Sequence, residues 1–322
     1  MPADPRPDRS ALLADVVRSG FVEGHHRGSL LALAADGSRV LALGDPDAAI
    51  FPRSSNKPMQ AVGMLEAGLD LDGELLALAC ASHSGEPFHI EGVRRVLAAA
   101  GLDEAALRTP PDWPVDEVER HALIAAGGQQ APILMNCSGK HAAMLATCVV
   151  NGWPTGTYAD ADHPLQVALR ATVERLSGEK APAVGVDGCG APLFAMSLAG
   201  LARSFVAIAT APDGAPESRV ARAIRRHPEW LGGTRRDVSQ LVAGVPGLIA
   251  KDGAEGVYAA ALPDGRAVAL KVDDGGQRAR PPVMVAALRA LGVDEPVLAE
   301  LAVAPLMGGG QEVGSVRAAF DA

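Results

Sequence analysis

The chain has 322 residues, of which 48% are hydrophobic and 21% charged, and this composition excludes an intrinsically disordered protein. A net charge of −9 and an aromatic content of only 3% argue against general binding to nucleic acids or anionic membranes, which favour basic surfaces. With four cysteines, no apolar run of about eighteen residues and no signal-peptide pattern, the sequence predicts a cytoplasmic protein with reduced cysteines.

The ends of the chain carry hairpin signals. Residues 1–10 are polar, and we expect a flexible tail there. Asp36-Gly37 then lies between two apolar runs, which strongly predicts a hairpin. A second hairpin is predicted around the turn at 263–265, and a helix is expected over 282–291.

The middle of the chain alternates between short apolar runs and helical patterns. We interpret residues 75–81 and 183–186 as buried strands. Helices are predicted to begin near Pro58, Pro87, Ser138 and Pro192. Because hairpins begin and end the pattern while helices fill the middle, we predict an α/β fold with a mixed or antiparallel sheet covered by helices. No long linker interrupts the chain, so one domain over residues 1–322 is expected, in one or two lobes.

The segment RSSNKPMQ (residues 53–60) precedes a predicted helix. Ser54 and Lys57 are three residues apart, so one helical turn would place the hydroxyl and the amine on the same side. A buried lysine with a lowered pKa can activate a serine, and Ser-x-x-Lys is the spacing of serine β-lactamases. Pro58 disfavours the α conformation at Lys57, which favours a looser turn. The alternative is a capping serine beside a solvated lysine.

The segment CASHSGEP (residues 80–87) is expected at the end of an apolar strand and before a helix. Its polar side chains could supply a second nucleophile or substrate contacts: Ser82, His83, Ser84 and Glu86. The alternative is a helix-capping loop with Cys80 packed in the core.

Two later segments each combine a cysteine with glycine. NCSGKHAAML (136–145) places Cys137 three residues before Lys140 at a predicted helix start, where a thiol pKa is lowered. VDGCGAP (186–192) sets Cys189 between two glycines. Two thiolates suit zinc, although the usual zinc-binding spacings are absent. His141 could be a ligand, a substrate contact or a structural residue, while Cys148 lies within a helix and is predicted to be a core residue.

The chain resembles the L-asparaginase II family of Ser-Lys amidohydrolases in five segments taken in order: RSSNKPMQ, CASHSGE, CSGKHAAML, VDGCGAP and AKDGAEGV, with VRSGFVEGHHRGSL as an opening signature. These segments lie between residues 17 and 257. The resemblance implies a fold similar to serine β-lactamases and glutaminases, a homodimer, and hydrolysis of L-asparagine to L-aspartate and ammonia.

The resemblance also implies two Ser-Lys pairs, which would be Ser54 with Lys57 and Ser82 with Lys251. Lys251 thereby becomes a catalytic candidate, although AKDGAEGV alone predicts a turn lysine in solvent. A neutral lysine would take the proton of one serine, whose oxygen attacks the side-chain amide; ammonia leaves, and water hydrolyses the acyl-enzyme. Ser54 is the preferred nucleophile, and Ser82 competes with it.

Some family members hold zinc through two cysteines and a lysine, which match Cys137, Lys140 and Cys189 here. We therefore expect zinc, with its need for catalysis left open. Five side chains are candidates for substrate recognition: Arg53 for the α-carboxylate, Asp187 or Glu86 for the α-ammonium, and His83 and His141 as hydrogen-bond partners.

Two other functions compete with the amidohydrolase hypothesis. Ser-x-x-Lys also suggests a penicillin-recognising serine hydrolase, but no S-D-N or K-T-G element follows it. Cys137 and Cys189 suggest a zinc or thiol sensor without turnover.

Overall fold

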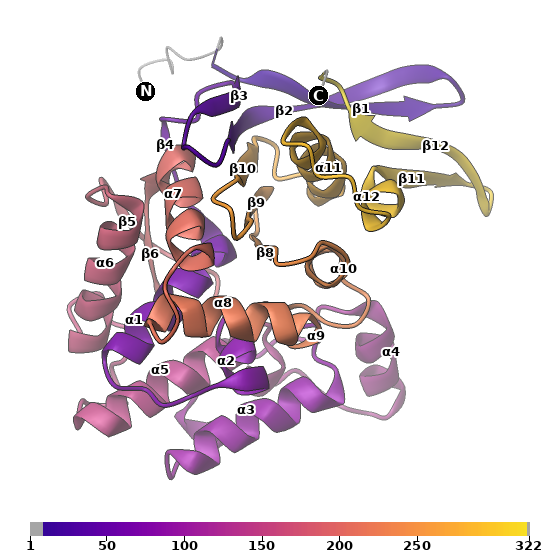
Figure 1. Ribbon diagram of the computed structural model, residues 1–322. Helices are drawn as coiled ribbons and strands as arrows, with labels where there is room; N and C mark the ends of the chain where they lie inside the picture. Colours follow the sequence, from indigo (N-terminus) through magenta and orange to yellow (C-terminus); the bar gives the residue numbers. More distant parts are fainter. Residues whose placement is uncertain (1–8, 321–322) are drawn as a thin grey trace, which may run out of the picture.

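An antiparallel sheet and a layer of helices make up the computed structural model, which describes residues 9–320 (Figure 1). The predicted tail at 1–10 therefore lies almost entirely outside the described residues. The sheet has eight strands in the order β11-β12-β1-β2-β10-β9-β8, with β3 paired to β2. The strands are β1 (Ala11–Arg18), β2 (Phe21–Leu33), β3 (Arg39–Leu43), β8 (Ile249–Asp252), β9 (Val257–Ala261), β10 (Ala267–Val272), β11 (Val303–Gly308) and β12 (Gln311–Ala318).

All strand pairings of this sheet are antiparallel, so the predicted sheet covered by helices is confirmed. Both predicted hairpins are present, as β2–β3 and β9–β10. Two short sheets pair β4 (Ala49–Ile50) with β7 (Met196–Ser197) and β5 (Val184–Val186) with β6 (Pro192–Phe194).

Helices pack against the sheet: in Figure 1, α7 is drawn to the left of β9 and β10, α11 and α12 are drawn to their right, and most other helices lie below the strands. Helix α7 packs against β2, β9 and β10, while α11 packs against β1, β10 and β12. The α-helices are α1 (Lys57–Glu66), α2 (Gly73–Ala79), α3 (Pro87–Ala99), α4 (Glu117–Ala125), α5 (Ser138–Asn151), α6 (Pro164–Ser177), α7 (Leu198–Ala209), α8 (Pro216–Arg226), α9 (Pro228–Leu231), α10 (Asp237–Gly244), α11 (Arg280–Ala290) and α12 (Val297–Leu301). Short 3₁₀ turns are η1 (Arg53–Asn56), η2 (Glu104–Ala106), η3 (Pro132–Leu134) and η4 (Gln277–Ala279). Among residues 9–320, every helix is too short or too polar to cross a bilayer.

Three sequence-based predictions of local structure are wrong. The run at 75–81 lies in and just after helix α2, because its leucines and alanines favour a helix and it contains no β-branched residue. Pro192 begins strand β6, and the next helix starts six residues later, where the Ser197 hydroxyl accepts a hydrogen bond from Gly200 N–H. Lys57 adopts the α conformation despite the following proline.

Other predictions are confirmed or need refinement. Helices do begin at Lys57, Pro87 and Ser138, and α11 covers the segment expected near the C-terminus. The run at 183–186 contains strand β5, but this strand lies at the surface, where Val186 is 81% exposed. Cys148 is buried in the core as predicted.

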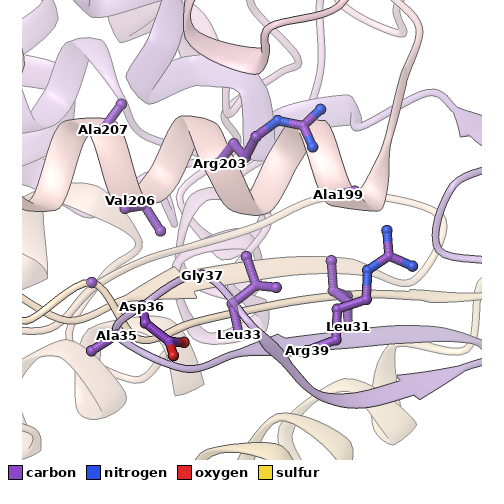
Figure 2. A pocket seen from close by; sticks show the side chains of 11 residues that line it. Leu31, Leu33, Ala35, Asp36, Gly37, Arg39, Ala199, Arg203, Val206 and Ala207 are labelled. Carbon is purple, nitrogen blue, oxygen red and sulfur yellow. The ribbon is translucent and has the colours of Figure 1, made fainter.

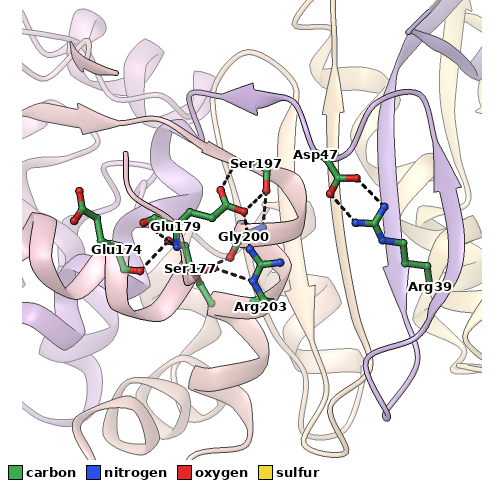
Figure 3. A network of polar contacts seen from close by, with 9 residues as sticks. Arg39, Asp47, Glu174, Ser177, Glu179, Ser197, Gly200 and Arg203 are labelled. Carbon is green, nitrogen blue, oxygen red and sulfur yellow. Dashed lines mark hydrogen bonds and ion pairs between the residues drawn. The ribbon is translucent and has the colours of Figure 1, made fainter. Parts of the chain in front are cut away.

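A polar network fixes the start of helix α7 to the end of α6 (Figure 3). Glu179 accepts hydrogen bonds from the backbone N–H of Ser197 at 2.9 Å and from its hydroxyl at 2.5 Å. Arg203 of α7 donates to the Ser177 carbonyl at 2.8 Å and to Glu179. These contacts attach the helix that covers the sheet to the rest of the helical layer.

The helices that carry candidate site residues pack closely at glycine. Gly139, between Ser138 and Lys140 in α5, faces Leu78 of α2. A Cβ at this position would lie 2.6 Å from the Leu78 carbonyl oxygen, and a backbone atom cannot move aside as a side chain can. Glycine therefore sets the distance between α5 and α2.

We expect Gly139→Ala to destabilise the protein, because the added methyl group would force α5 and α2 apart. The expected loss is about 1–3 kcal/mol of unfolding free energy, although alanine alone favours a helix by about 1 kcal/mol. Urea unfolding followed by circular dichroism measures the change. Gly156→Ala is the control, since its Cβ would meet only Arg108 at 3.9 Å. An unchanged midpoint for Gly139→Ala would contradict the proposed close packing.

Candidate active site

The Lys57 amine is buried at the start of helix α1. Its side chain is only 1% exposed, and its Nζ donates to Ser82 Oγ at 3.0 Å and to the Ala81 carbonyl at 2.5 Å. In residues 9–320 no carboxylate lies within ion-pair distance of this amine. Lys57 is therefore no solvated lysine, and its side-chain partner is a serine hydroxyl.

Ser54 lies one turn before Lys57. The 3₁₀ turn η1 contains Ser54, and its carbonyl accepts a hydrogen bond from the Lys57 backbone N–H, so the two residues are neighbours as the spacing predicts. Ser54 is half-buried. The side-chain hydrogen bond, however, joins Lys57 to Ser82, whereas the family resemblance pairs Lys57 with Ser54 and Ser82 with Lys251.

Lys251 is fully buried on β8, at one edge of the large sheet, and is not the exposed turn residue that its local sequence suggests. Its Nζ contacts Asp252 Oδ1 at 2.5 Å and the Asp252 carbonyl at 2.7 Å. Its own carbonyl accepts a hydrogen bond from Ser55 Oγ at 3.0 Å. A Cβ on Gly253 would lie 2.8 Å from the Pro52 carbonyl oxygen. Strand β8 and the turn that carries Ser54 are therefore in direct contact.

Arg53 precedes Ser54 and holds an uncommon backbone conformation, with φ of 50°. Its Nε donates to Asp187 Oδ1 at 2.8 Å, and its Nη1 lies 3.7 Å from Glu255 Oε1. Asp187 comes from the β5–β6 turn, far away in sequence. Arg53 is predicted to bind the α-carboxylate of an amino acid, and Asp187 its α-ammonium group. The structure places these two residues together, beside Ser54.

The loop at 82–86 is anchored on several sides. Ser82 N–H donates to the Leu231 carbonyl, and His83 N–H donates to the Asn136 carbonyl. The His83 ring lies 2.8 Å from Ser138 Oγ, and burial lowers the pKa of His83 well below its usual value, so its ring is neutral.

Glu86 ends this loop and is occupied by protein contacts. Its two carboxylate oxygens accept hydrogen bonds at 2.8 Å from the backbone N–H and the hydroxyl of Thr234. The side chain is buried at the N-terminus of α3. Of the two carboxylates predicted to meet an α-ammonium group, Glu86 therefore has both oxygens engaged by Thr234, whereas the hydrogen bonds from Arg53 and from Gly188 N–H both go to Oδ1 of Asp187.

Cys137 and Cys189 meet in a small buried cluster with Met135 and Ala191. Cys137 is the N-cap residue of α5, and Cys189 lies in the tight β5–β6 turn. The Cys137 thiol donates to Asn136 Oδ1 at 3.1 Å. Interaction with the Cys189 sulfur, together with burial, raises the pKa of Cys137, while the neighbouring Cys137 thiol and the Lys140 amine lower the pKa of Cys189 far below that of an ordinary thiol. Cys189 is therefore the thiolate of the pair.

Lys140 lies beside this thiolate, with Nζ 3.3 Å from Cys189 Sγ. Burial by itself would lower the pKa of the amine, but the Cys189 and Cys137 sulfurs outweigh it and raise the pKa to about 12. His141 contacts the Tyr158 hydroxyl through Nδ1 at 2.8 Å, while its buried Nε2 has no hydrogen-bond partner.

This group of donors fits a soft divalent cation. Two sulfurs, a lysine nitrogen and an unpartnered imidazole nitrogen are buried together, which is the donor chemistry that zinc prefers. Within the described part of the chain, no three His, Cys, Asp or Glu side chains are arranged to hold a metal, so any site here needs Lys140. Lysine binds a metal only as the neutral amine, and the ion would have to displace the proton.

A cavity of about 570 Å³ lies elsewhere, between the β2–β3 hairpin and helix α7 (Figure 2). Its walls are mostly apolar, with Arg39 and Arg203 at its edge, and both arginines are already paired with carboxylates. None of the predicted site residues lines it.

Sequence reasoning missed several residues that support the candidate site, chiefly Asp252 beside Lys251, Ser55 and Tyr158. The amino-acid composition also points to the three lysines of the candidate site. Only five of the 29 Lys and Arg residues are lysines, and three of these five are among the largest fully buried side chains: Lys57, Lys140 and Lys251. Scarce lysines that are buried are unusual, because a charged amine is normally left in solvent, and they are therefore candidates for a functional site.

Comparison with known proteins gives a family match over nearly the whole chain. The family model described as L-asparaginase II matches residues 14–318. No curated protein matches the sequence.

Several solved structures are similar at low identity. A β-lactamase from Mycobacterium bovis is 14% identical over 85% of this chain and 95% of its own, with a TM-score of 0.44. The native form of Mglu is 14% identical over 82% of this chain and 63% of its own, with a TM-score of 0.42, so this chain spans less than two thirds of Mglu. EstCE1, a hydrolase with promiscuous acyltransferase activity, is 13% identical over 87% of this chain and 92% of its own, with a TM-score of 0.37. Similarity at this level says nothing about substrate.

We expect Glu86 and Thr234 to stabilise the fold as a pair. Glu86→Ala and Thr234→Ala should each destabilise the protein, and the double variant should lose less than the sum, with a coupling of about 0.5–3 kcal/mol. Urea unfolding of the four proteins measures this coupling. Glu86→Ala combined with Ser239→Ala is the control, because Ser239 donates to the Pro228 carbonyl instead. Additive losses for Glu86 and Thr234 would contradict the anchoring role.

Proposed function

The chain belongs to the L-asparaginase II family, and we propose that it hydrolyses L-asparagine to L-aspartate and ammonia. The family supports an amidohydrolase. One observation carries the proposal further: the buried Lys57 amine lies 3.0 Å from Ser82 Oγ, at hydrogen-bond distance and sheltered from water. As a neutral amine, Lys57 would receive the proton of this hydroxyl, which is the step that makes a serine system reactive.

Ser54 remains the proposed nucleophile, with Ser82 as its competitor. Ser54 is half-buried and adjoins Arg53, whereas Ser82 is only 6% exposed. In this assignment Ser54 attacks the side-chain amide carbon, and the Lys57–Ser82 contact carries protons to and from the reacting groups. Ammonia leaves, and water then hydrolyses the aspartyl ester. If Ser82 attacks instead, Lys57 acts as its direct base.

Charge complementarity supports a free amino acid as the substrate. Arg53 and Asp187 offer one guanidinium and one carboxylate side by side, which match the α-carboxylate and α-ammonium groups of an amino acid. Asp187 is preferred over Glu86 for the ammonium group, because both oxygens of Glu86 accept hydrogen bonds from Thr234, whereas Asp187 Oδ2 has only a contact with Cys189 Sγ at 3.9 Å. His83 and His141 remain proposed hydrogen-bond partners.

We also propose zinc as a bound metal, held by Cys137, Lys140 and Cys189. The 3.3 Å contact between Lys140 and Cys189 and the unpartnered Nε2 of His141 support this donor set. A bound zinc ion would supply positive charge that keeps both sulfurs deprotonated and could polarise a nearby carbonyl group. A homodimer and a cytoplasmic location are further proposals, which rest on the family resemblance and on composition.

The competing functions give different results. A penicillin-recognising hydrolase would be labelled covalently by a penicillin. A zinc or thiol sensor would bind metal and release no ammonia from any amide.

We expect the purified protein to release ammonia from L-asparagine. Ser54→Ala and Ser82→Ala should each lower kcat by about 10²–10⁴-fold, because each removes a hydroxyl from the reacting system. Coupled ammonia assays measure the rates, and mass spectrometry of rapidly quenched enzyme identifies the acylated serine. Ser218→Ala, whose hydroxyl donates to the Ala215 carbonyl, is the control. Full activity in both active-site variants would refute the assignment.

We expect zinc content to depend on two of the four cysteines. Cys137→Ser and Cys189→Ser should each lower the bound zinc measured by elemental analysis after extensive dialysis, by about 10-fold or more, because each removes a sulfur ligand. Cys148→Ser is the matched control, since this cysteine packs in the core. Equal zinc in all three variants, or none in the wild type, would contradict the proposed site. Activity before and after chelation then shows whether catalysis needs the ion.

A further inference from the structure

A buried group of charged side chains surrounds Lys251. The two carboxylate oxygens of Asp252 contact different side chains. Oδ1 lies 2.5 Å from Lys251 Nζ, and Oδ2 lies 2.5 Å from Arg236 Nη2. Arg280 Nη1 lies 3.5 Å from the same Oδ2. Asp252 and Arg280 are buried, at 3% and 4% exposed, and the Arg236 side chain is partly exposed at 19%. One carboxylate therefore meets three cationic side chains away from bulk water.

These side chains come from separate elements, so the fold has to bring them together. Asp252 ends β8, Arg236 is the N-cap residue of α10, and Arg280 begins α11. Arg280 also donates to the Gly253 carbonyl and lies over the Tyr258 ring, 5.9 Å from its centroid. The arginines thus hold the backbone after Asp252 as well as its carboxylate.

Four other titratable groups lie around this cluster. Lys57 from α1 and Cys80 after α2 are near Lys251, while Asp237 from α10 and Tyr258 from β9 are near Asp252. Burial raises the pKa of Cys80 to about 12 and raises that of Tyr258, so neither carries charge near neutral pH. Two carboxylates, Asp237 and Asp252, then face two guanidiniums.

Lys251 is the additional cation in this group. If its amine is protonated, its charge has no carboxylate of its own, because Asp252 already pairs with Arg236 and Arg280 and because burial raises the pKa of Asp237. Burial is the main cause that lowers the pKa of Lys251 to about 8; Asp252 opposes the decrease and Lys57 adds to it. An aspartate without the arginines would instead hold Lys251 as a permanent ammonium group.

We propose that Asp252, held by Arg236 and Arg280, is a positioning residue for Lys251: Asp252 directs the amine, while the two arginines offset the negative charge of Asp252 so that Lys251 is not fixed in a permanent ion pair. This inference rests on the proposed amidohydrolase function only in that the family resemblance makes Lys251 a candidate catalytic residue. Asp252 acts through Lys251 and is given no contact with substrate.

The arrangement of charges predicts that two variants shift the titration of Lys251 in opposite directions. Asp252→Asn keeps the shape of the side chain and removes its negative charge, so the titration of Lys251 should move to lower pH by about one unit. Arg236→Gln removes a positive charge, so the titration should move to higher pH by a similar amount. A role in folding alone would not shift a proton equilibrium in opposite directions.

The scarcity of lysine makes the measurement direct. Protein labelled with ¹³C and ¹⁵N only at lysine gives side-chain NMR signals from five residues, and Lys251→Arg identifies the signal of interest. Asp47→Asn, which removes the exposed partner of Arg39, is the control and should leave the Lys251 titration unchanged. In assays of the active enzyme, the pH at which kcat rises should move in the same two directions, while KM changes by less than about twofold.

The outcomes separate the two proposals. Opposite shifts of the Lys251 signal support the inference even if the protein does not hydrolyse L-asparagine, in which case only the proposed function fails. Unchanged titrations, or shifts in the same direction, overturn the inference even in an active enzyme. If Asp252→Asn does not fold, Arg236→Gln decides alone, because this partly exposed arginine can be replaced with less disruption.

Discussion

The candidate site depends on keeping lysine amines out of water. A protonated amine is costly to bury, so each buried lysine needs either a partner for its charge or an environment that removes the proton. The three buried lysines meet this constraint differently: Lys57 contacts a serine hydroxyl, Lys140 contacts a thiolate, and Lys251 contacts a carboxylate shared with arginines. Buried lysine therefore occurs in three different chemical environments within one fold: beside a hydroxyl, beside a thiolate and beside a carboxylate.

The elements that hold these lysines are fixed by backbone contacts. The turn before α1, the loop after α2 and the start of α5 are joined through carbonyl and N–H groups as well as side chains. Gly139 and Gly253 let backbones approach closely at these junctions. Contacts of this kind hold the site residues in place by the fold itself, which is the arrangement that lowers the reorganisation needed during catalysis.

Much of the fold follows from local sequence. The turn signals at Asp36-Gly37 and at 263–265 identified both hairpins, because glycine at these turns adopts a backbone conformation that other residues avoid. The prediction of a strand at 75–81 is wrong because the apolar character of a short run does not by itself distinguish a buried strand from a helix, whereas its leucines and alanines favour the helix. Motif order predicted which residues are candidates for the site. It could not predict that Lys57 reaches Ser82, or that Asp252 divides its carboxylate, because such contacts depend on tertiary packing between distant segments.

The distribution of lysine also affects how the protein can be handled chemically. Lys180 is paired with Glu174 at the surface, and its side chain is 90% exposed. Reagents directed at primary amines, such as activated esters used to attach proteins to beads or polymers, would reach this side chain readily and leave the three buried amines intact. Conjugation at Lys180 would anchor the molecule through the end of α6 and keep the proposed catalytic residues chemically unaltered.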